Sequence, residues 1–226
     1  GMQVIAICGT VGSGKTTLLN RLTQYYGPRA SWHEERPQDN PYISDYYADS
    51  RRWSFHSQVT FLSLYFDDPK WQHPDPDTEF FFFDRSFAEN LVIARYRLQQ
   101  GDLTQDEYDV LERLTKGVAA MMPPIDKYVY LDCSVQTVLE HMRRRGREYE
   151  DDLDLMYVYE LKALYDAWQQ TLPPEGQEYA QQPHSMQRFI LRRSSSSASL
   201  RSNASSNSIG ERLSGQWSTQ RPQRMH

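Results

Sequence analysis

The stretch Gly9-Thr10-Val11-Gly12-Ser13-Gly14-Lys15-Thr16-Thr17 decides the fold of this chain. It matches the phosphate-binding pattern G-x-x-x-x-G-K-[ST] without a mismatch. The apolar residues 4–8 before it are typical of a buried strand, and residues 18–22 after it have a helical pattern. Glycines let consecutive backbone N–H groups curl round a phosphate, and the positive end of the following helix points at the same anion. The whole stretch therefore predicts a nucleotide-phosphate site.

Two side chains of this loop have a direct role in the predicted chemistry. Lys15 supplies a positive charge for the outer phosphates, and the Thr16 hydroxyl is placed to ligate Mg²⁺. Negative charge on the transferred phosphoryl group must be stabilised in the transition state, so we expect Lys15 to take part in catalysis. ATP and Mg²⁺ are the expected cofactors, with residues 9–17 as the phosphate contacts.

Length and composition fit one α/β domain. The chain has 226 residues, of which 38% are hydrophobic, and this is enough for a sizeable core. Its net charge of −5 argues against a general nucleic-acid binder. The two cysteines form no pattern, which is typical of a reducing cytoplasm, and no apolar stretch has the length of a membrane span. We expect a cytoplasmic protein that binds neither nucleic acid nor membranes.

The order of the expected elements indicates the fold class. Strand patterns alternate with helical patterns, the strands lying at residues 4–8, 30–35, 79–84 and 128–132 and the later helices at 43–66, 88–100, 104–122, 134–145 and 154–171. Residues 67–78 contain three prolines and are expected to form a loop. Such an alternation behind a phosphate-binding loop predicts a P-loop kinase fold. Its parallel sheet would have four to five strands with helices on both faces, and residues 188–191 are a weak candidate for the fifth strand.

The end of the chain has a different composition. From residue 194 onward it is rich in Ser, Asn, Gln and Arg. Such a segment buries too little apolar surface to offset the entropy of ordering it. The sequence therefore predicts a kinase domain over residues 1–193 and a mobile Ser/Arg-rich tail over residues 194–226.

Polar side chains follow three of the expected strands. In open α/β sheets, ligands bind beyond the carboxyl ends of the strands. One such end is the phosphate loop, a second is Glu34-Glu35 and a third is Asp84-Arg85-Ser86. Glu34 or Glu35 could accept the proton of an attacking hydroxyl group. Arg85 could contact both the acceptor and the transferred group, while Asp84 could hold Mg²⁺ or its water.

An arginine cluster, Arg143-Arg144-Arg145-Gly146-Arg147, ends the helix after the fourth expected strand. Cations at a helix end complement the helix dipole. They also suit a lid that closes over ATP and brings arginine to the transition state, and Gly146 would permit the bend. We interpret the segment as an Arg-rich lid in which Arg143, Arg145 and Arg147 contact ATP.

Taken together, these motifs resemble the deoxynucleoside kinase family, and particularly its bacterial deoxyadenosine/deoxyguanosine branch. The resemblance covers roughly residues 2–170. Residues 35–42 look like the family's Glu-Pro-Val loop, whose glutamate is the general base. That register selects Glu35 as the base, with Glu34 second and close to the substrate. The Asp84-Arg85-Ser86 motif is also similar to that of the family, which implies that Arg85 contacts the substrate and assists catalysis.

The same resemblance implies the contacts of the nucleoside. Tyr47 resembles the tyrosine at the sugar 3′-hydroxyl, and Glu160 resembles the glutamate that joins it there. Gln58 matches the glutamine that hydrogen-bonds the base. Asn90 stands where the family often has an aspartate, and Tyr65 where it often has an arginine. Both positions tune base preference in the family, so the preferred base stays open. A homodimer is implied as well.

Three functions are compatible with a phosphate-binding loop in this setting, and the other motifs distinguish them. The favoured one is a deoxynucleoside kinase that phosphorylates the 5′-hydroxyl of deoxyadenosine or another purine deoxynucleoside, with deoxycytidine as an alternative. The second is a nucleoside monophosphate kinase resembling thymidylate kinase, but Glu34-Glu35 would repel the acceptor phosphate and the Arg-Glu-Pro-Gly-Gly motif is missing. The third is a nucleotide-binding switch protein, which would need an Asn-Lys-x-Asp segment that the chain lacks.

Overall fold

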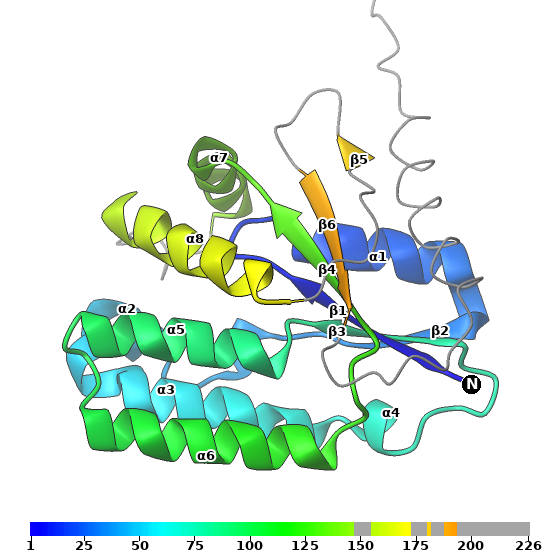
Figure 1. Ribbon diagram of the computed structural model, residues 1–226, viewed down its shortest axis with the longest axis horizontal. Coiled ribbons are helices and arrows are strands. Elements are labelled where there is room, and N and C mark those ends of the chain that lie inside the picture. The colour runs from blue at the N-terminus through cyan, green and yellow to red at the C-terminus, as the bar shows by residue number, and fades with distance from the viewer. Residues whose placement is uncertain (147–154, 173–179, 182–187, 194–226) are drawn as a thin grey trace, which may run out of the picture.

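The computed structural model describes residues 1–146, 155–172, 180–181 and 188–193. One sheet has the strand order β2-β3-β1-β4-β6-β5 (Figure 1). Its strands are β1 (Gln3–Cys8), β2 (Ala30–His33), β3 (Phe80–Asp84), β4 (Lys127–Asp132), β5 (Ala180–Gln181) and β6 (Arg188–Arg193). The first four are parallel neighbours, which confirms the expected parallel sheet. The candidate fifth strand exists as β6 but runs antiparallel to β4, so its place in a parallel sheet was wrong.

The helices surround this sheet on both faces, as expected. They are α1 (Lys15–Tyr26), α2 (Ile43–Ala48), α3 (Ser50–Leu64), α4 (Pro69–Gln72), α5 (Phe87–Gln99), α6 (Gln105–Met121), α7 (Val135–Arg145) and α8 (Leu155–Gln170). Three single 3₁₀ turns, Gly27–Arg29, Pro37–Asp39 and Tyr65–Asp67, join them. In Figure 1, α3, α5 and α6 form a layer below the sheet, while α7 and α8 lie together near the top of β4.

The core explains why the central strands are apolar throughout. Every residue of β1 and β3 is buried, because helices pack on both faces of these strands. On one face, Ile5 and Phe82 pack against the leucines of α1. On the other face, Ala6 and Cys8 pack against α7 and α8, and Phe81 packs against α3 and α6. The sheet therefore fixes where each strand ends, and the candidate site lies at those ends.

The expected loop at residues 67–78 contains a helix that the prolines concealed. Asp68 caps α4 by accepting from the N–H of Lys70 at 2.9 Å, and Pro69 occupies the first turn, where a proline needs no partner. The turn is fixed by Trp71, whose indole N–H donates to the carbonyl of Tyr65 at 2.6 Å. A proline at a helix start was thus mistaken for a helix breaker.

None of the helices in the described ranges combines the length and the apolar character that crossing a membrane requires. The segment 147–154 and the proposed tail 194–226 lie outside the described residues.

Candidate active site

A pocket opens beyond the carboxyl ends of β1, β2 and β3. It encloses about 870 Å³, including the open solvent at its mouth. The residues expected at the site that line it are Gly12, Ser13, Gly14, Val11, Lys15, Thr16, Glu35, Tyr47, Gln58, Asp84, Arg85 and Asn90. Five segments far apart in the sequence thus meet in one cavity.

The phosphate loop has the conformation that its glycines predict. Gly12 and Gly14 have φ values of +74° and +93°, in the left-handed region that side chains avoid. A Cβ atom at Gly12 would lie 2.8 Å from the carbonyl oxygen of Val138, so α7 packs directly on the loop. His141 reinforces this contact, because its Nδ1 lies 2.6 Å from the Gly12 carbonyl oxygen.

Lys15 reaches across the loop that carries it. Its ammonium group donates to the carbonyl oxygens of Gly9 at 2.9 Å and Thr10 at 3.4 Å. Burial and the nearby charge of Arg85 lower the pKa of Lys15. Gly9 and Thr10 therefore hold Lys15 from beneath and do not line the pocket, while Thr17 is exposed on α1. Direct phosphate contact by these three residues stays a prediction.

Glu35 and Arg85 form an ion pair at the mouth of the phosphate loop. Arg85 Nε lies 3.1 Å from Glu35 Oε2, without the alignment of a hydrogen bond, and the two side chains are 11% and 15% exposed. Arg85 Nη1 donates to the hydroxyl of Tyr165 at 3.2 Å. Burial alone would lower the pKa of Arg85, but the charge of Glu35 raises it well above its ordinary value. The pair keeps both groups charged and close together.

The backbone at Arg85 is strained. Its φ of +85° makes it the only non-glycine residue with positive φ among the described residues. The backbone N–H of Arg85 donates to the carbonyl of Ile7 at 2.9 Å, which continues the ladder between β1 and β3 by one residue. Such strain persists where the surrounding structure holds it, and it is concentrated at functional sites.

Asp84 ends β3 and is 3% exposed. Its Oδ1 has no hydrogen-bond partner in the described structure. Burial raises the pKa of Asp84 to about 6, against the opposing charge of Lys15. A buried carboxylate oxygen without a partner is costly, and a bound cation would satisfy it. Together with the Thr16 hydroxyl in the same pocket, it fits a Mg²⁺ ion.

The far wall of the pocket carries two amides. Gln58 on α3 is 4% exposed and Asn90 on α5 is 5% exposed, and both line the cavity. The Nδ2 donor of Asn90 has no partner among the described residues. Tyr46 and Tyr47 on α2 flank these amides, with the Tyr46 hydroxyl accepting from Arg97 Nε at 2.7 Å. This wall can therefore hydrogen-bond a planar polar ligand such as a nucleobase.

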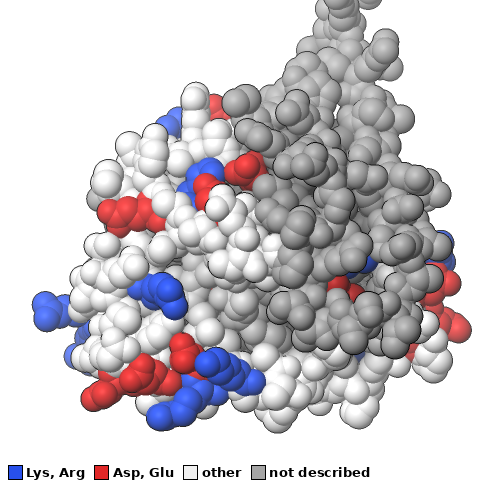
Figure 2. Space-filling model, viewed as in Figure 1, with Lys and Arg blue, Asp and Glu red and all other residues white. Residues whose placement is uncertain are grey.

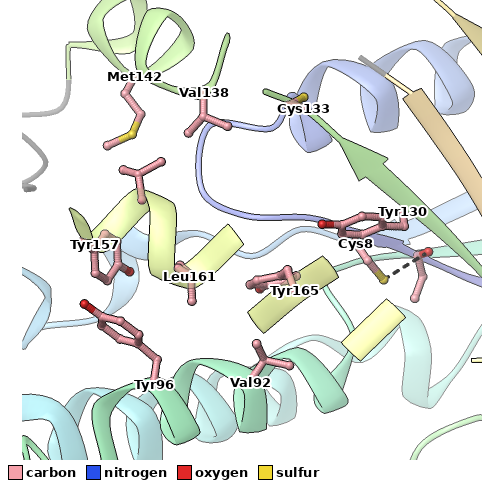
Figure 3. Packing of buried hydrophobic residues seen from close by; sticks show 12 residues of the cluster. Cys8, Val92, Tyr96, Tyr130, Cys133, Val138, Met142, Tyr157, Leu161 and Tyr165 are labelled. Atoms are coloured by element: carbon pink, nitrogen blue, oxygen red, sulfur yellow. Dashed lines mark hydrogen bonds between the residues drawn. The ribbon is translucent and has the colours of Figure 1, made fainter. Parts of the chain in front are cut away.

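Two expected substrate contacts, Glu34 and Glu160, do not line the pocket. Glu34 is exposed and does not line the pocket, because neighbouring residues after β2 face opposite sides and Glu35 takes the inner one. Glu160 faces away from the pocket and accepts from Gln100 Nε2 at 3.0 Å. Helix α8 instead lines the cavity with Tyr157 and Leu161, one turn apart on its inner face (Figure 3).

The arginine cluster stands apart from the cavity. Arg143 and Arg145 are exposed in the last turn of α7 and do not line the pocket, and Arg147 lies outside the described residues. The helix ends at Gly146, which has a φ of +62° as the glycine at this position predicts.

Several residues at the pocket were not expected from the sequence. Tyr165 contacts Arg85, and Phe61, Ile93 and Tyr157 provide apolar walls. The spacing of Tyr157, Leu161 and Tyr165 by four residues was a visible signal of one helix face, although nothing in that spacing distinguishes a pocket wall from core.

The chain is similar to several known proteins. A model of the family described as deoxynucleoside kinase matches residues 5–196. The chain is 31% identical over 174 residues to a deoxyadenosine/deoxycytidine kinase of Bacillus subtilis, covering 74% of this chain and 76% of that protein. It is 27% identical over 187 residues to a deoxyguanosine kinase of Lactobacillus johnsonii, covering 80% of each. A solved deoxyadenosine kinase from M. mycoides with bound dATP superimposes with a TM-score of 0.64 at 25% identity, covering 74% of this chain and 84% of that one.

Proposed function

The chain belongs to the deoxynucleoside kinase family, and we propose that it transfers the γ-phosphoryl group of ATP to the 5′-hydroxyl of a deoxynucleoside. One observation carries this proposal: a single cavity holds the phosphate loop with Lys15, the Glu35–Arg85 pair and the amide wall of Gln58 and Asn90. A donor phosphate, a reacting hydroxyl and a base can therefore lie in line. The names of the relatives favour deoxyadenosine or another purine deoxynucleoside, with deoxycytidine as the alternative.

The proposed mechanism assigns each charged group one task. Glu35 accepts the proton of the 5′-hydroxyl, since it lines the cavity beside the phosphate loop and is not the carboxylate assigned to Mg²⁺. Arg85 is held against Glu35 and orients the same oxygen. Lys15 stabilises the negative charge on the transferred phosphoryl group.

The nucleoside would be held by the wall opposite the phosphate loop. Gln58 presents a donor and an acceptor to the base, and the unpartnered Nδ2 of Asn90 offers a further donor. Tyr47 projects from α2 into the same cavity, where it can contact the sugar. The apolar side chains between them exclude water from the reacting end.

Thr16 and Asp84 would hold the Mg²⁺ ion that accompanies ATP. When bound, the ion neutralises charge on the donor phosphates. No group of three His, Cys, Asp or Glu side chains suited to a metal occurs in the described ranges. This fits an ion that takes most of its ligands from phosphate and water.

The remaining assignments are also proposals. Arg143, Arg145 and Arg147 contact ATP, residues 1–193 form the kinase domain, and the protein is a cytoplasmic homodimer. Figure 2 shows acidic and basic side chains interspersed among the described residues of one face. That the protein binds no nucleic acid is proposed from its net charge of −5.

An ATP-consumption assay tests the proposal. The panel contains the four deoxynucleosides, dTMP and AMP, and Lys15→Ala serves as the inactive control. We expect turnover with at least one deoxynucleoside and none with either monophosphate. Turnover with dTMP or AMP alone would refute the assignment of the acceptor, and activity in Lys15→Ala would refute the site.

A further inference from the structure

Glu89 is a fully buried carboxylate in the first turn of α5. Both of its oxygens accept hydrogen bonds. Oε1 accepts from the backbone N–H of Gly9 at 3.0 Å. Oε2 accepts from the backbone N–H and, at 2.9 Å, from the hydroxyl of Ser86. Since it lines no part of the pocket, Glu89 has no direct contact with the proposed substrates.

These hydrogen bonds join two loops that have different tasks. Gly9 opens the phosphate loop after β1, and Ser86 follows Arg85 after β3. The two strands are neighbours, with Ile7 opposite Asp84, and their last ladder bond joins Arg85 N–H to the carbonyl of Ile7. Beyond that bond the sheet no longer sets the spacing of the chains. Glu89 provides the connection there.

A helix cap alone does not account for this arrangement. A glutamate in the first turn commonly reaches back to the backbone N–H at the helix start, and one oxygen is enough for that bond. Burying a carboxylate is costly unless it is fully hydrogen-bonded. Here the second oxygen binds Gly9, which is 80 residues away in the sequence. This contact ties the phosphate loop to the loop after β3 and so limits the distance between them.

The charge of Glu89 acts on the same two loops. Burial lowers the pKa of Lys15, and the carboxylates of Asp84, Glu89 and Glu35 oppose this shift.

We propose that Glu89 is a positioning residue for phosphoryl transfer, setting the distance between the phosphate loop and the arginine that orients the acceptor. It acts through Gly9 on the donor side and through Ser86 on Arg85. The inference rests on the proposed kinase function. Misplacement of reacting groups by small distances lowers turnover more than it lowers binding.

The test compares two glutamates that cap helices in the same way. Glu107 in the first turn of α6 accepts from the backbone N–H of Thr104 at 2.9 Å, does not line the pocket and, among the described residues, accepts from no backbone N–H of a distant loop. Glu89→Gln replaces one accepting oxygen by an amide donor that faces donors. Glu107→Gln keeps an oxygen that can accept the cap bond from Thr104 and removes only the charge. kcat at saturating ATP and deoxynucleoside is normalised to folded protein, KM values are determined separately, and the melting temperature is recorded for each variant.

We expect Glu89→Gln to lower kcat about 10- to 100-fold, with the KM of the nucleoside changed less than threefold, and Glu107→Gln to keep kcat within twofold. If both variants lose similar thermal stability while both keep kcat, Glu89 is only a cap and the inference is overturned. Should Glu89→Gln not fold, Glu89→Asp keeps the charge but is one methylene too short to join both loops. A folded Glu89→Asp with wild-type kcat would overturn the inference equally.

A double variant identifies the route of the effect. If Glu89 acts through Arg85, combining Glu89→Gln with Arg85→Lys lowers kcat by much less than the product of the two single losses. Fully multiplicative losses would contradict that route. A wild-type protein that phosphorylates no acceptor refutes the proposed function instead, so the two failures are distinguishable.

Discussion

Replacing Asp84 by Asn is expected to stabilise the protein while disabling it. Asp84 is 3% exposed, and its Oδ1 lacks a partner in the described structure. Burial raises its pKa from an ordinary value of 3.8 to about 6. At neutral pH the folded protein must therefore carry a charge that the unfolded chain carries more easily. Asn has nearly the same shape and no charge, so it removes this cost.

The magnitude follows from the two pKa values. A shift from 3.8 to about 6 corresponds to about 3 kcal/mol of folding free energy, at roughly 1.4 kcal/mol for each pH unit. Between about pH 4 and pH 6 the folded state binds more protons than the unfolded state, so wild-type stability falls as the pH rises through this window. Below it both states hold the proton and the difference disappears. A gain of about 3 kcal/mol corresponds to a rise in melting temperature of roughly 6–12 °C for a chain of this size.

Urea unfolding and thermal melts of wild type and Asp84→Asn at pH 4, 5, 6, 7 and 8 measure this effect. The stability difference should be close to zero at pH 4 and should reach its full value by pH 7. Asp132→Asn is the matched control, since Asp132 also ends a strand but is paired with Lys162 at 3.1 Å and should give no gain. Turnover of Asp84→Asn should fall about 100-fold, in line with the loss of one charged group at a transition state. A variant less stable than wild type at pH 7, or a difference that does not change with pH, would refute the reasoning.

Three further outcomes follow from the same geometry. Glu35→Gln should lower kcat by about 10²- to 10⁴-fold with ATP affinity nearly unchanged, measured by single turnover and ATP titration, whereas exposed Glu34→Gln should be neutral. Gln58→Ala should raise the KM of the nucleoside at least tenfold and leave the KM of ATP unchanged in steady-state assays, because Gln58 is proposed to hydrogen-bond the base and not ATP. Arg97→Met leaves the partly buried carboxylate of Asp102 without its ion pair at 3.0 Å, so denaturant unfolding should show a loss of about 3 kcal/mol.

The fold could be predicted because its determining signals are local. The phosphate loop, the apolar run of β3 and the capping box before α6 each act within a few residues. The direction of β6 could not be predicted, because six residues of strand pattern say nothing about which neighbour they pair with or in which direction. Helix α4 was not predicted, because the prolines of this segment were interpreted as signs of a loop. A proline indicates a helix start when a capping residue such as Asp68 precedes it.

The site could be predicted in part, and each residue that was misplaced or missed depends on tertiary packing. Motif positions such as Lys15, Glu35 and Gln58 lie where their elements end or face the cavity, so sequence order was sufficient. Glu160 depended on the rotation of α8 against the sheet, which tertiary packing decides. Glu89 was missed because its pattern is that of an ordinary helix cap, and only its contact with Gly9 distinguishes it.

The charges around the pocket explain why the sequence also supplies cations outside it. Lys15 and Arg85 contribute two positive charges, while Glu35, Asp84 and Glu89 contribute three negative charges close to them. A site with this balance does not attract a triphosphate by itself, because each carboxylate repels the incoming phosphates in a region of low dielectric. Further positive charge must arrive with the nucleotide or close over it. Under the proposed function, Mg²⁺ at the unpartnered oxygen of Asp84 would meet the first requirement. The exposed arginines that end α7, which do not line the pocket, would meet the second by closing over ATP.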